Sequence, residues 1–317
     1  MSLLVISGAE VAEHLTYEAC IPLKRRAMTA LSQGRTKQLL RQIIDLPGGR
    51  AFGVMPGAMA DTLGAKLISV FPAAVSGAPS HQGVVALFDP ETGATAAIVD
   101  ASALTGIRTA AASAAATDAL ARDDSRRLAI LGTGEQARRH VEAIRAVRPI
   151  DRVTIWGRAR DKAEALAAEV GAAVADSAEA AVLDADIVCT VTASAEPVLL
   201  GRWIAPGTHL NLVGSSRAGP VEVDSDLVRR ARFFADHEEG VRRQGAEFLK
   251  ALEEGAVGED HLLGEIGAVF AGTLPGRTGR HDVTAYKSLG AIVQDLAAGW
   301  YLVERARAEG WGTRVAF

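Results

Sequence analysis

The pattern of hydrophobic and polar positions divides the chain into a first part rich in short strands and a later part in which strands and helices alternate. Near the start, the apolar residues 3–6 predict a strand, and Ser7 with Glu10 has the spacing of a capping box that opens a helix. Residues 16–31 predict a second helix, which ends before Gly34.

Residues 41–100 have the pattern of a sheet. Short apolar runs separated by Pro and Gly predict strands at 42–46, 51–55, 65–71, 84–88 and 94–99. Between the last two, residues 89–93 read Asp-Pro-Glu-Thr-Gly, a hairpin turn with Pro where φ is fixed and Gly where φ can be positive. We expect this part of the chain to form a mainly antiparallel α+β domain.

From residue 123 onward, strand and helix patterns alternate. An alanine-rich helix predicted at 104–122 leads to a polar break. Buried strands are predicted at 128–131, 152–156, 186–190, 209–213 and 233–235, with helices after the first of them and at 161–170. This alternation is typical of a doubly wound parallel sheet, the Rossmann architecture. We predict an α/β protein: a Rossmann domain at 123–287 is inserted between 1–122 and 288–317, and the second segment begins with a long helix at 288–309.

The segment that joins the strand at 128–131 to the next helix has the spacing GxGxxA. Gly132 permits a tight turn, Gly134 lets a phosphate approach the backbone, and Ala137 allows the helix to pack closely on the strand. The flanking strand and helix favour a dinucleotide site over a glycine turn without a ligand. The predicted pyrophosphate-binding residues are Gly132, Thr133, Gly134, Glu135, Gln136 and Ala137.

The end of the next strand bears on the choice of cofactor. A NAD-selective site usually has an Asp or Glu there to bind the ribose 2′-hydroxyl, but this chain has Trp156-Gly157-Arg158. An arginine suits a 2′-phosphate because it offers a planar fork of donors. Arg158 therefore predicts a preference for NADPH. NADH is the alternative if Arg158 is only a solvated loop residue.

Two later strands end in polar loops, one containing Thr190 and Thr192 and the other containing Val213 and Gly214. Ligands of open α/β sheets bind beyond the carboxyl ends of the strands. Both loops are therefore candidates for the nicotinamide end of the cofactor site, and the alternative is that they are ordinary polar loops.

Composition narrows the class of protein. The 317 residues are 49% hydrophobic and 23% charged, which is typical of a globular chain long enough for two domains. The net charge of −4 argues against a nucleic-acid partner. Cys20 and Cys189 have no CxxC partner, so we expect neither a disulfide framework nor a metal site. The sequence shows no secretory signal and no apolar run long enough for a bilayer, so we expect a cytoplasmic protein without a membrane partner.

Several separate segments match one known family. The most specific is Leu104-Thr105-Gly106-Ile107-Arg108-Thr109-Ala110-Ala111, followed by the glycine turn at 132–137. The other matching segments are Leu40-Arg41, Met55-Pro56, Gly64-Ala65-Lys66, Phe71-Pro72, Ser80-His81-Gln82, Leu87-Phe88-Asp89, Tyr286-Lys287-Ser288-Leu289-Gly290 and Asp295-Leu296. On these segments the chain resembles the ornithine cyclodeaminase/mu-crystallin family over nearly its whole length.

The resemblance implies a homodimer in which 1–122 and 288–317 form the substrate-binding and dimerisation domain. It also implies that the substrate is a small amino acid or a cyclic imino acid, bound by its carboxylate. By motif, Arg41, Lys66 and Arg108 would be the cations that bind this carboxylate. Each of them lies in or beside an apolar segment, where a cation is rarely left unpaired. The alternative is that each pairs with a protein carboxylate.

One departure from the family pattern bears on the reaction. Cyclodeaminases of this family carry Gly-Ala-Asp-x-Pro-Gly-Lys after a later Rossmann strand, and its Asp is the acid/base group. The corresponding run here, residues 214–220, reads Gly-Ser-Ser-Arg-Ala-Gly-Pro, so Ser216 stands at the Asp position and Pro220 at the Lys position. A serine hydroxyl cannot act as that general base near neutral pH.

The expected reaction is therefore the NAD(P)H-dependent reduction of a cyclic ketimine, Δ1-pyrroline-2-carboxylate or Δ1-piperideine-2-carboxylate, to the cyclic amino acid. Lys66 can donate the proton. Ser216 can orient a water or the imine nitrogen, or it can have only a structural role in its loop. The alternatives are an ornithine cyclodeaminase that uses NAD+ catalytically, an alanine-dehydrogenase-like enzyme, and an NADPH-dependent binding protein of the mu-crystallin kind.

Overall fold

The computed structural model describes residues 2–71 and 81–316, so Pro72 and Ser80, which belong to matching segments, lie outside the described residues. The chain forms two compact units, one of Met1–Arg108 with Ala291–Phe317 and the other of Thr109–Gly290. The predicted boundaries at 123 and 288 differ from these. The first division falls inside helix α3 (Ala101–Leu120), whose later residues are buried and belong to the second unit.

The first unit is built on a mixed, mainly antiparallel sheet with the order β16-β1-β7-β6-β5-β4-β2, in which β3 also pairs with β4. In this sheet β1 and β7 are parallel, and the other pairs are antiparallel. The strands are β1 (Ser2–Ile6), β2 (Lys37–Gln38), β3 (Gln42–Leu46), β4 (Arg50–Ala58), β5 (Leu63–Val70), β6 (His81–Phe88), β7 (Thr95–Asp100) and β16 (Thr313–Ala316). The strands predicted from the sequence are confirmed, whereas β2 and β16 were not predicted.

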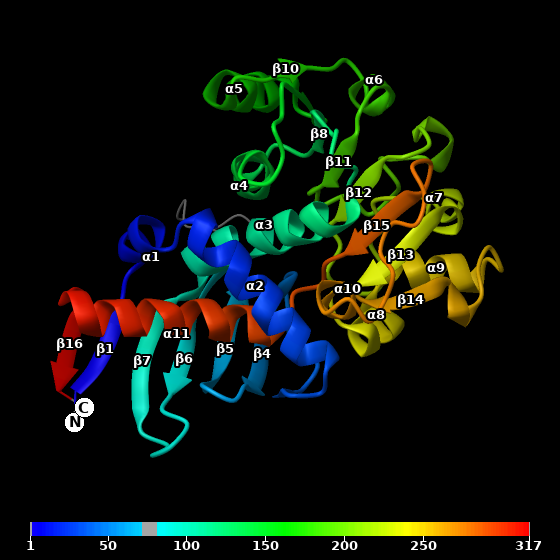
Figure 1. The fold of residues 1–317 in the computed structure, drawn as a ribbon. Helices are drawn as coiled ribbons and strands as arrows, with labels where there is room; N and C mark the ends of the chain where they lie inside the picture. Colours follow the sequence, from blue (N-terminus) through cyan, green and yellow to red (C-terminus); the bar gives the residue numbers. More distant parts are fainter. Residues whose placement is uncertain (1, 72–80, 317) are drawn as a thin grey trace. The chain divides into compact units, whose positions relative to one another are not determined.

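Helices cover one face of this sheet. Helix α11 (Ile292–Glu309) runs across the strands, and α2 (Tyr17–Ser32) packs beside it (Figure 1). Helix α1 (Gly8–His14) begins with the predicted capping box, because Ser7 accepts from the backbone N–H of Glu10 while the Glu10 carboxylate accepts from the backbone N–H of Ser7. The hairpin turn is also as predicted, since the Asp89 carboxylate accepts from the backbone of residues 91 and 92.

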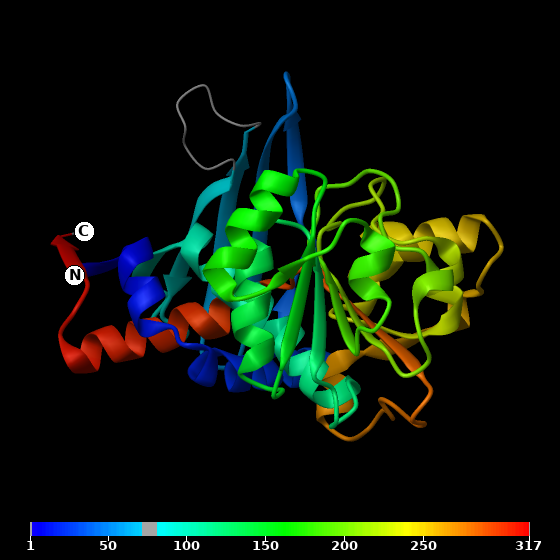
Figure 2. The same cartoon turned by 90° about the horizontal axis from the view of Figure 1, so that it is seen from above.

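The second unit is built on a parallel sheet with the order β10-β9-β8-β11-β12-β15-β13-β14. Its strands are β8 (Arg127–Leu131), β9 (Arg152–Trp156), β10 (Ala173–Val174), β11 (Ile187–Thr190), β12 (His209–Leu212), β13 (Ala231–Ala235), β14 (Leu262–Glu265) and β15 (Val283–Lys287). Strands β11, β12 and β15 are buried along their whole length, as expected for a sheet covered on both faces. Figure 2 shows helices on both sides of these strands. This confirms the predicted doubly wound α/β architecture.

Strand β8 lies at the switch point of this sheet. The chain goes from β8 to β9 and β10 on one side, and then returns to β11 and β12 on the other. A crevice outside the carboxyl ends of the strands is the ligand site in such sheets. The helices are α4 (Glu135–Arg145), α5 (Arg160–Val170), α6 (Ala178–Val182), α7 (Ser225–Arg230), α8 (Glu238–Gln244), α9 (Ala246–Glu253) and α10 (Ile266–Phe270), with short 3-10 turns at Gly201–Trp203 and Glu259–His261.

The final helix begins later than predicted, at Ile292 instead of Ser288. Residues 288–290 are not helical, because Ser288 continues the pairing of β15 with β12 and Gly290 has a positive φ of +88°. Ser288 donates to the carbonyl oxygen of Leu212, and Leu289 and Gly290 both donate to the Asp236 carboxylate. In the part of the chain that the structure describes, no helix is long and apolar enough to cross a membrane.

Candidate functional site

The turn between β8 and α4 has a backbone shaped for close approach by a ligand. Gly132 has a φ of +134°, and a Cβ there would lie 2.8 Å from the carbonyl oxygen of Val191, so the position requires glycine. Gly134 is the exposed N-cap of α4, and a Cβ there would meet no atom within 4 Å. Ala137 is fully buried. An open glycine in front of a helix N-terminus fits a pyrophosphate group.

The remaining residues of this turn have structural partners of their own. The Thr133 methyl group lies against Gly157, where a Cβ would overlap it. The Glu135 carboxylate lies 3.6 Å from Arg139. The carbonyl oxygen of Gln136 accepts from Nδ1 of the buried His140 at 2.7 Å. The Thr133 side chain thus packs within the turn, that of Glu135 lies along α4, and the approach to the backbone is open at Gly134.

Arg158 follows β9 and differs from its neighbour Arg160 in its contacts. The guanidinium of Arg160 is bonded to Glu164 at 2.8 Å and to Asp176 at 2.5 Å. Arg158 is exposed, and within residues 2–71 and 81–316 no hydrogen bond or ion pair engages its side chain. Its planar fork of donors is therefore available at the strand end where the adenosine ribose of a dinucleotide binds in this architecture.

The loops after β11 and β12 are joined by a residue that the sequence analysis did not single out, Glu222. One carboxylate oxygen accepts from the backbone N–H and the hydroxyl of Thr192, at 2.6 and 2.7 Å. The other accepts from the Thr190 hydroxyl at 2.8 Å and from the Gly214 N–H at 2.7 Å. Thr190 and Glu222 are fully buried. The Thr190 side chain therefore supports its loop from within, while Gly214 is exposed and Val213 is nearly buried.

A buried ion pair, Lys287 with Glu247, lies next to Glu222. The Lys287 ammonium, at the end of β15, forms a 2.7 Å ion pair with Glu247 of α9, and both side chains are fully buried. Lys287 also donates to the carbonyl oxygen of Ser215 at 2.6 Å. Burial raises the pKa of Glu222, while the charge of Lys287 and the hydrogen bonds from Thr192 oppose that increase. Three strand ends, those of β11, β12 and β15, are thus tied together by buried charges.

In the first unit, two of the three predicted carboxylate-binding cations meet. The Lys66 ammonium on β5 and the Arg108 Nε on α3 lie 3.0 and 3.2 Å from the same oxygen of Asp295 on α11, and the three side chains are almost fully buried. Lys66 also donates to the Thr105 hydroxyl, and Arg108 donates to the Gln294 side chain at 3.0 Å. The alternative that Lys66 and Arg108 pair with a protein carboxylate is therefore realised in part, because they share a single one.

Arg41 lies beside this cluster in the sheet. Gln42 pairs with Val54, so Arg41 comes next to Met55, which pairs with Lys66 on the following strand. Arg41 is half-buried, and its charge is one of the influences that lower the pKa of Lys66. The structure thus brings Arg41, Lys66 and Arg108 into one electrostatic neighbourhood.

Burial and the neighbouring charges shift the pKa values of Lys66 and Asp295. Burial lowers the pKa of the Lys66 ammonium to about 8, with a further contribution from Arg108, while Asp295 acts in the opposite direction. Burial alone would raise the pKa of Asp295, but the charges of Arg108 and Lys66 outweigh burial and hold it below its ordinary value. An ammonium with a pKa of about 8 is mostly protonated near neutral pH and can still release its proton.

Ser216 lies in the loop after β12 and is half-buried. The preceding residue, Ser215, holds the loop in place, since its hydroxyl donates to the carbonyl oxygen of Pro220 at 2.5 Å. A carboxylate is absent from position 216 itself, so the chemistry that an Asp would supply there is missing from this loop.

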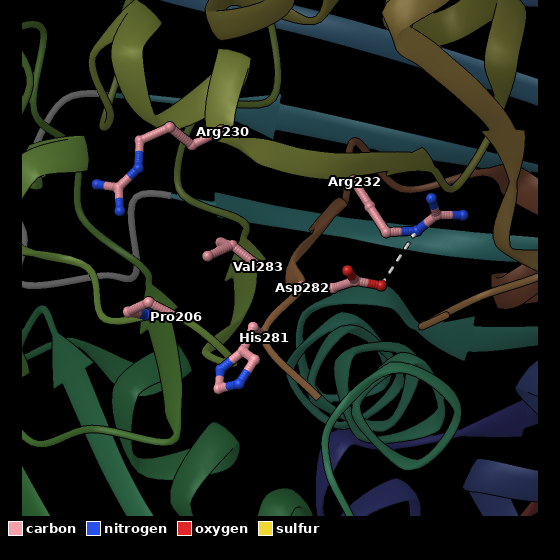
Figure 3. Close-up of a pocket in the computed structure, with 6 residues that line it drawn as sticks. All are labelled: Pro206, Arg230, Arg232, His281, Asp282 and Val283. Carbon is pink, nitrogen blue, oxygen red and sulfur yellow. Dashed lines mark ion pairs between the residues drawn. The ribbon is translucent and has the colours of Figure 1, made fainter. Parts of the chain in front are cut away.

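A cavity of about 320 Å³ opens at the opposite edge of the parallel sheet, where β13 and β15 begin (Figure 3). Figure 3 shows the two guanidinium groups at its wall pointing away from one another, with that of Arg232 directed toward Asp282. Because ligands of such sheets bind at the carboxyl ends of the strands, this cavity is separate from the predicted cofactor site. It is lined by Pro206, Arg230, Arg232, His281, Asp282 and Val283.

The comparisons with known proteins agree with the resemblance seen in the sequence. Residues 2–310 match the model of the ornithine cyclodeaminase/mu-crystallin family. The chain is 36% identical to the ketimine reductase mu-crystallin of Mus musculus over 303 residues, which cover 92% of this chain and 94% of the mouse protein.

Two solved structures are similar over almost the whole chain. The Δ1-pyrroline-2-carboxylate reductase of Thermococcus litoralis, solved with NADH and L-proline, has a TM-score of 0.94 and 31% identity, covering 99% of this chain and 100% of that one. An archaeal alanine dehydrogenase dimer with bound NAD has a TM-score of 0.94 and 26% identity over 100% of both chains. The chain belongs to the ornithine cyclodeaminase/mu-crystallin family.

Proposed function

We propose that this protein is an NAD(P)H-dependent oxidoreductase that reduces a cyclic ketimine carboxylate, Δ1-pyrroline-2-carboxylate or Δ1-piperideine-2-carboxylate, to the cyclic amino acid. The observation that carries the proposal is the charge of the buried cluster in the first unit. Lys66 and Arg108 share one carboxylate oxygen of Asp295, which leaves an excess positive charge in an apolar environment. Such a cluster favours a bound anion, and the substrate carboxylate supplies it.

The second unit has the features that a nicotinamide dinucleotide requires. Gly132 and Gly134 fit the pyrophosphate, and the loops containing Thr192 and Gly214 lie at the carboxyl ends of the strands on the other side of the switch point. When bound, the reduced nicotinamide supplies the hydride that the imine carbon accepts. The similarity to a reductase solved with NADH and L-proline supports this assignment.

In our assignment, residues of the first unit bind the substrate and supply the proton that it receives. An ammonium has three donors, and within the described residues Lys66 uses one on Thr105 and one on Asp295. We assign the third to the substrate. Arg108 and Arg41 bind the carboxylate, and Lys66 gives its proton to the imine nitrogen unless the substrate arrives already protonated. The C=N bond becomes a CH–NH bond, and Lys66 regains a proton from solvent.

Ser216 distinguishes this proposal from ornithine cyclisation, which needs a group that takes up protons at that place. In our assignment Ser216 orients the imine nitrogen or a water, and no general base is required there. Ammonia release from ornithine with NAD+ would favour the cyclodeaminase instead. Reduction of pyruvate with ammonia would favour an alanine-dehydrogenase-like enzyme, and tight NADPH binding without turnover would favour a binding protein.

We further propose that NADPH is preferred over NADH. Arg158 is exposed with its guanidinium unengaged by described residues, and the end of β9 has no acidic residue for a ribose 2′-hydroxyl. A 2′-phosphate is the group that matches this fork of donors.

We also propose a homodimer formed through the first unit. Strand β3 is exposed along its whole length, and its successive residues Ile43 and Ile44 point to opposite faces, so both faces of the β3–β4 hairpin carry uncovered apolar groups. The similar archaeal alanine dehydrogenase is described as a dimer. The exposed apolar side chains around this hairpin are Leu39, Ile43, Ile44, Leu46, Phe52 and Phe71.

The proposal is tested by following nicotinamide absorbance with purified protein, NADPH or NADH, and each of the two cyclic imino acids. We expect cofactor oxidation together with formation of proline or pipecolate. Arg108→Ala should raise the KM for the imino acid strongly while leaving the affinity for the cofactor unchanged, because of the two ligands we assign Arg108 to the substrate carboxylate alone. An unchanged KM in Arg108→Ala would remove this residue from the substrate site.

A further inference from the structure

We propose that Glu222 is a positioning residue that sets the nicotinamide end of the cofactor site by holding two loops in register. The inference rests on the proposed function, because it requires that the second unit binds a nicotinamide dinucleotide. The two loops are residues 191–194, called the β11 loop, and residues 213–216, called the β12 loop. Glu222 lies outside the segments that match the family, outside the run 214–220 and outside the glycine turn at 132–137.

The carboxylate of Glu222 forms a bridge between the two loops. One oxygen accepts the Thr192 N–H of the β11 loop at 2.6 Å, and the other accepts the Gly214 N–H of the β12 loop at 2.7 Å. Each oxygen also accepts a hydroxyl, from Thr192 and from Thr190. The backbone of both loops is therefore fixed by one side chain.

Glu222 is itself held by segments outside these loops. Its carbonyl oxygen accepts from the backbone of Val198 and Leu199 at 2.8 and 3.1 Å, and its N–H donates to Glu247 at 3.3 Å. The next residue, Val223, forms a parallel bridge with Leu199. With its backbone fixed and its side chain fully buried, Glu222 can transmit a defined position to both loops.

The spacing between the loops is tighter than a side chain would permit. A Cβ at Gly214 would overlap the carbonyl oxygen of Thr192 and the carboxylate of Glu222. The β12 loop therefore approaches the β11 loop through a glycine, and the carboxylate occupies the space beside it. Loss of the bridge leaves two closely packed backbones without their shared acceptor, so the loops must shift.

The bridge requires an acceptor on both sides of the Glu222 side chain. Backbone N–H groups can only donate, and one of them faces each oxygen of Glu222, so both oxygens must accept. A glutamine has nearly the same shape, but its NH2 group must face either Thr192 or Gly214. Glu222→Gln thus removes one backbone acceptor without creating a cavity.

The expected consequence is confined to one part of the cofactor. The pyrophosphate turn follows β8, and the adenosine end lies toward β9, whereas Glu222 acts on the loops after β11 and β12, on the other side of the switch point. A defect at Glu222 should therefore weaken contacts to the nicotinamide end and spare those to ADP-ribose.

The test compares two ligands by calorimetry: the reduced dinucleotide that the wild-type protein prefers, and the matching ADP-ribose or 2′-phospho-ADP-ribose, which lacks nicotinamide. In Glu222→Gln we expect the dinucleotide to bind between about 10- and 100-fold more weakly, the usual effect of leaving a buried backbone donor without its charged acceptor. We also expect kcat to fall, because the nicotinamide is displaced. Affinity for the ADP-ribose compound should change less than about 2-fold, within the spread expected for an unaffected contact.

Asp186→Asn is the matched control. Asp186 is a nearly buried carboxylate that accepts the backbone N–H groups of Arg126 and Arg127 at 3.0 Å each, at the start of β8 and so at the opposite edge of the sheet. Both N–H groups face the same oxygen, so the side-chain amide oxygen in Asp186→Asn can keep them, and the variant instead loses the ion pairs with Arg122 and Arg127. It removes a nearly buried carboxylate charge and should lower stability while leaving both affinities unchanged. A loss of the two affinities in equal proportion in Glu222→Gln, or no loss in either, would overturn the inference.

A second variant covers failure of Glu222→Gln to fold. Thr190→Val keeps the shape of a fully buried side chain and removes one hydroxyl bond to Glu222. It should show the same selective loss for the dinucleotide at a smaller size, and equal effects on the two ligands would again contradict the inference. Failure of the wild-type protein to bind either ligand would instead refute the proposed function, and the inference with it.

Discussion

Replacement of Asp295 by asparagine tests the electrostatic account of the substrate site. The side chain keeps its size, but the negative charge shared by Lys66 and Arg108 is removed. At 3.0 Å and an effective dielectric constant of about 20, the Coulomb attraction between Lys66 and Asp295 has an upper limit of about 5.5 kcal/mol. Water and local rearrangement offset part of it, so we expect the ammonium of Lys66 to lose about 3 kcal/mol of stabilisation.

A loss of that size lowers the pKa of Lys66 by about 2. The Lys66 pKa is about 8 in the wild-type protein, because burial lowers it and Asp295 restores part of the loss. If the protonated form of Lys66 donates the proton, kcat/KM falls as pH rises through this pKa. The decline should therefore begin near pH 8 in the wild-type protein and about 2 pH units lower in Asp295→Asn.

The assay is the pH profile of kcat/KM with Δ1-pyrroline-2-carboxylate, measured for both proteins. Protonation of the free substrate affects the pH profiles of both proteins equally. A difference in pH between the two declines of kcat/KM therefore reflects the protein. Asp118→Asn is the control, since it removes a 2.6 Å ion pair with Arg148 in the second unit and should leave the profile in place. A decline at the same pH in Asp295→Asn and in the wild-type protein would refute the assignment of Lys66 as proton donor.

Three further predictions concern the cofactor, the dimer and acid stability. Arg158→Ala should weaken NADPH binding by about 2 kcal/mol, or roughly 30-fold, and leave NADH binding unchanged; equal losses in titrations with both would contradict the assignment. Ile44→Asp should shift the mass measured by light scattering from dimer to monomer, because it places a charge on the exposed apolar hairpin. Burial lowers the pKa of His140 to about 4 and that of His209 to about 3, from 6.5. The unfolded chain therefore binds more protons than the folded protein below pH 6.5. As the pH falls toward the folded pKa values, each histidine should lower the free energy of unfolding by up to about 1.4 kcal/mol per pH unit. Urea titrations that show constant stability from pH 6.5 to 4.5 would contradict this.

The sequence was most informative where the signal is local. The strands at 42–46 and 152–156 begin and end as predicted, and each is followed at once by turn residues, Pro47-Gly48 after the first and Gly157 after the second. The backbone at Gly132 has the positive φ that the spacing of the glycine turn implies. In these segments the residues that decide the conformation lie within a few positions of one another.

The parts that the sequence did not predict depend on contacts between distant segments. Asp295 lies 229 positions from Lys66, and although it belongs to a matching segment, no local pattern shows that it pairs two cations. Glu222 lies 30 positions after Thr192, in a polar run that looks like an ordinary loop. The segment before α11 also depends on a distant residue, since the Asp236 carboxylate accepts from the backbone N–H groups of Leu289 and Gly290.

The proposed hydride transfer to the imine carbon is tested most directly by following the hydrogen that the cofactor carries. The protein is incubated with Δ1-pyrroline-2-carboxylate and NADPH or NADH deuterated at C4 of the nicotinamide ring, on the face that is transferred, and the proline is analysed by mass spectrometry and NMR. We expect one deuterium on the α carbon of each proline formed and equal amounts of oxidised cofactor and proline. Proline without deuterium, or no reduction of the imine while ornithine and NAD+ release ammonia, would contradict this.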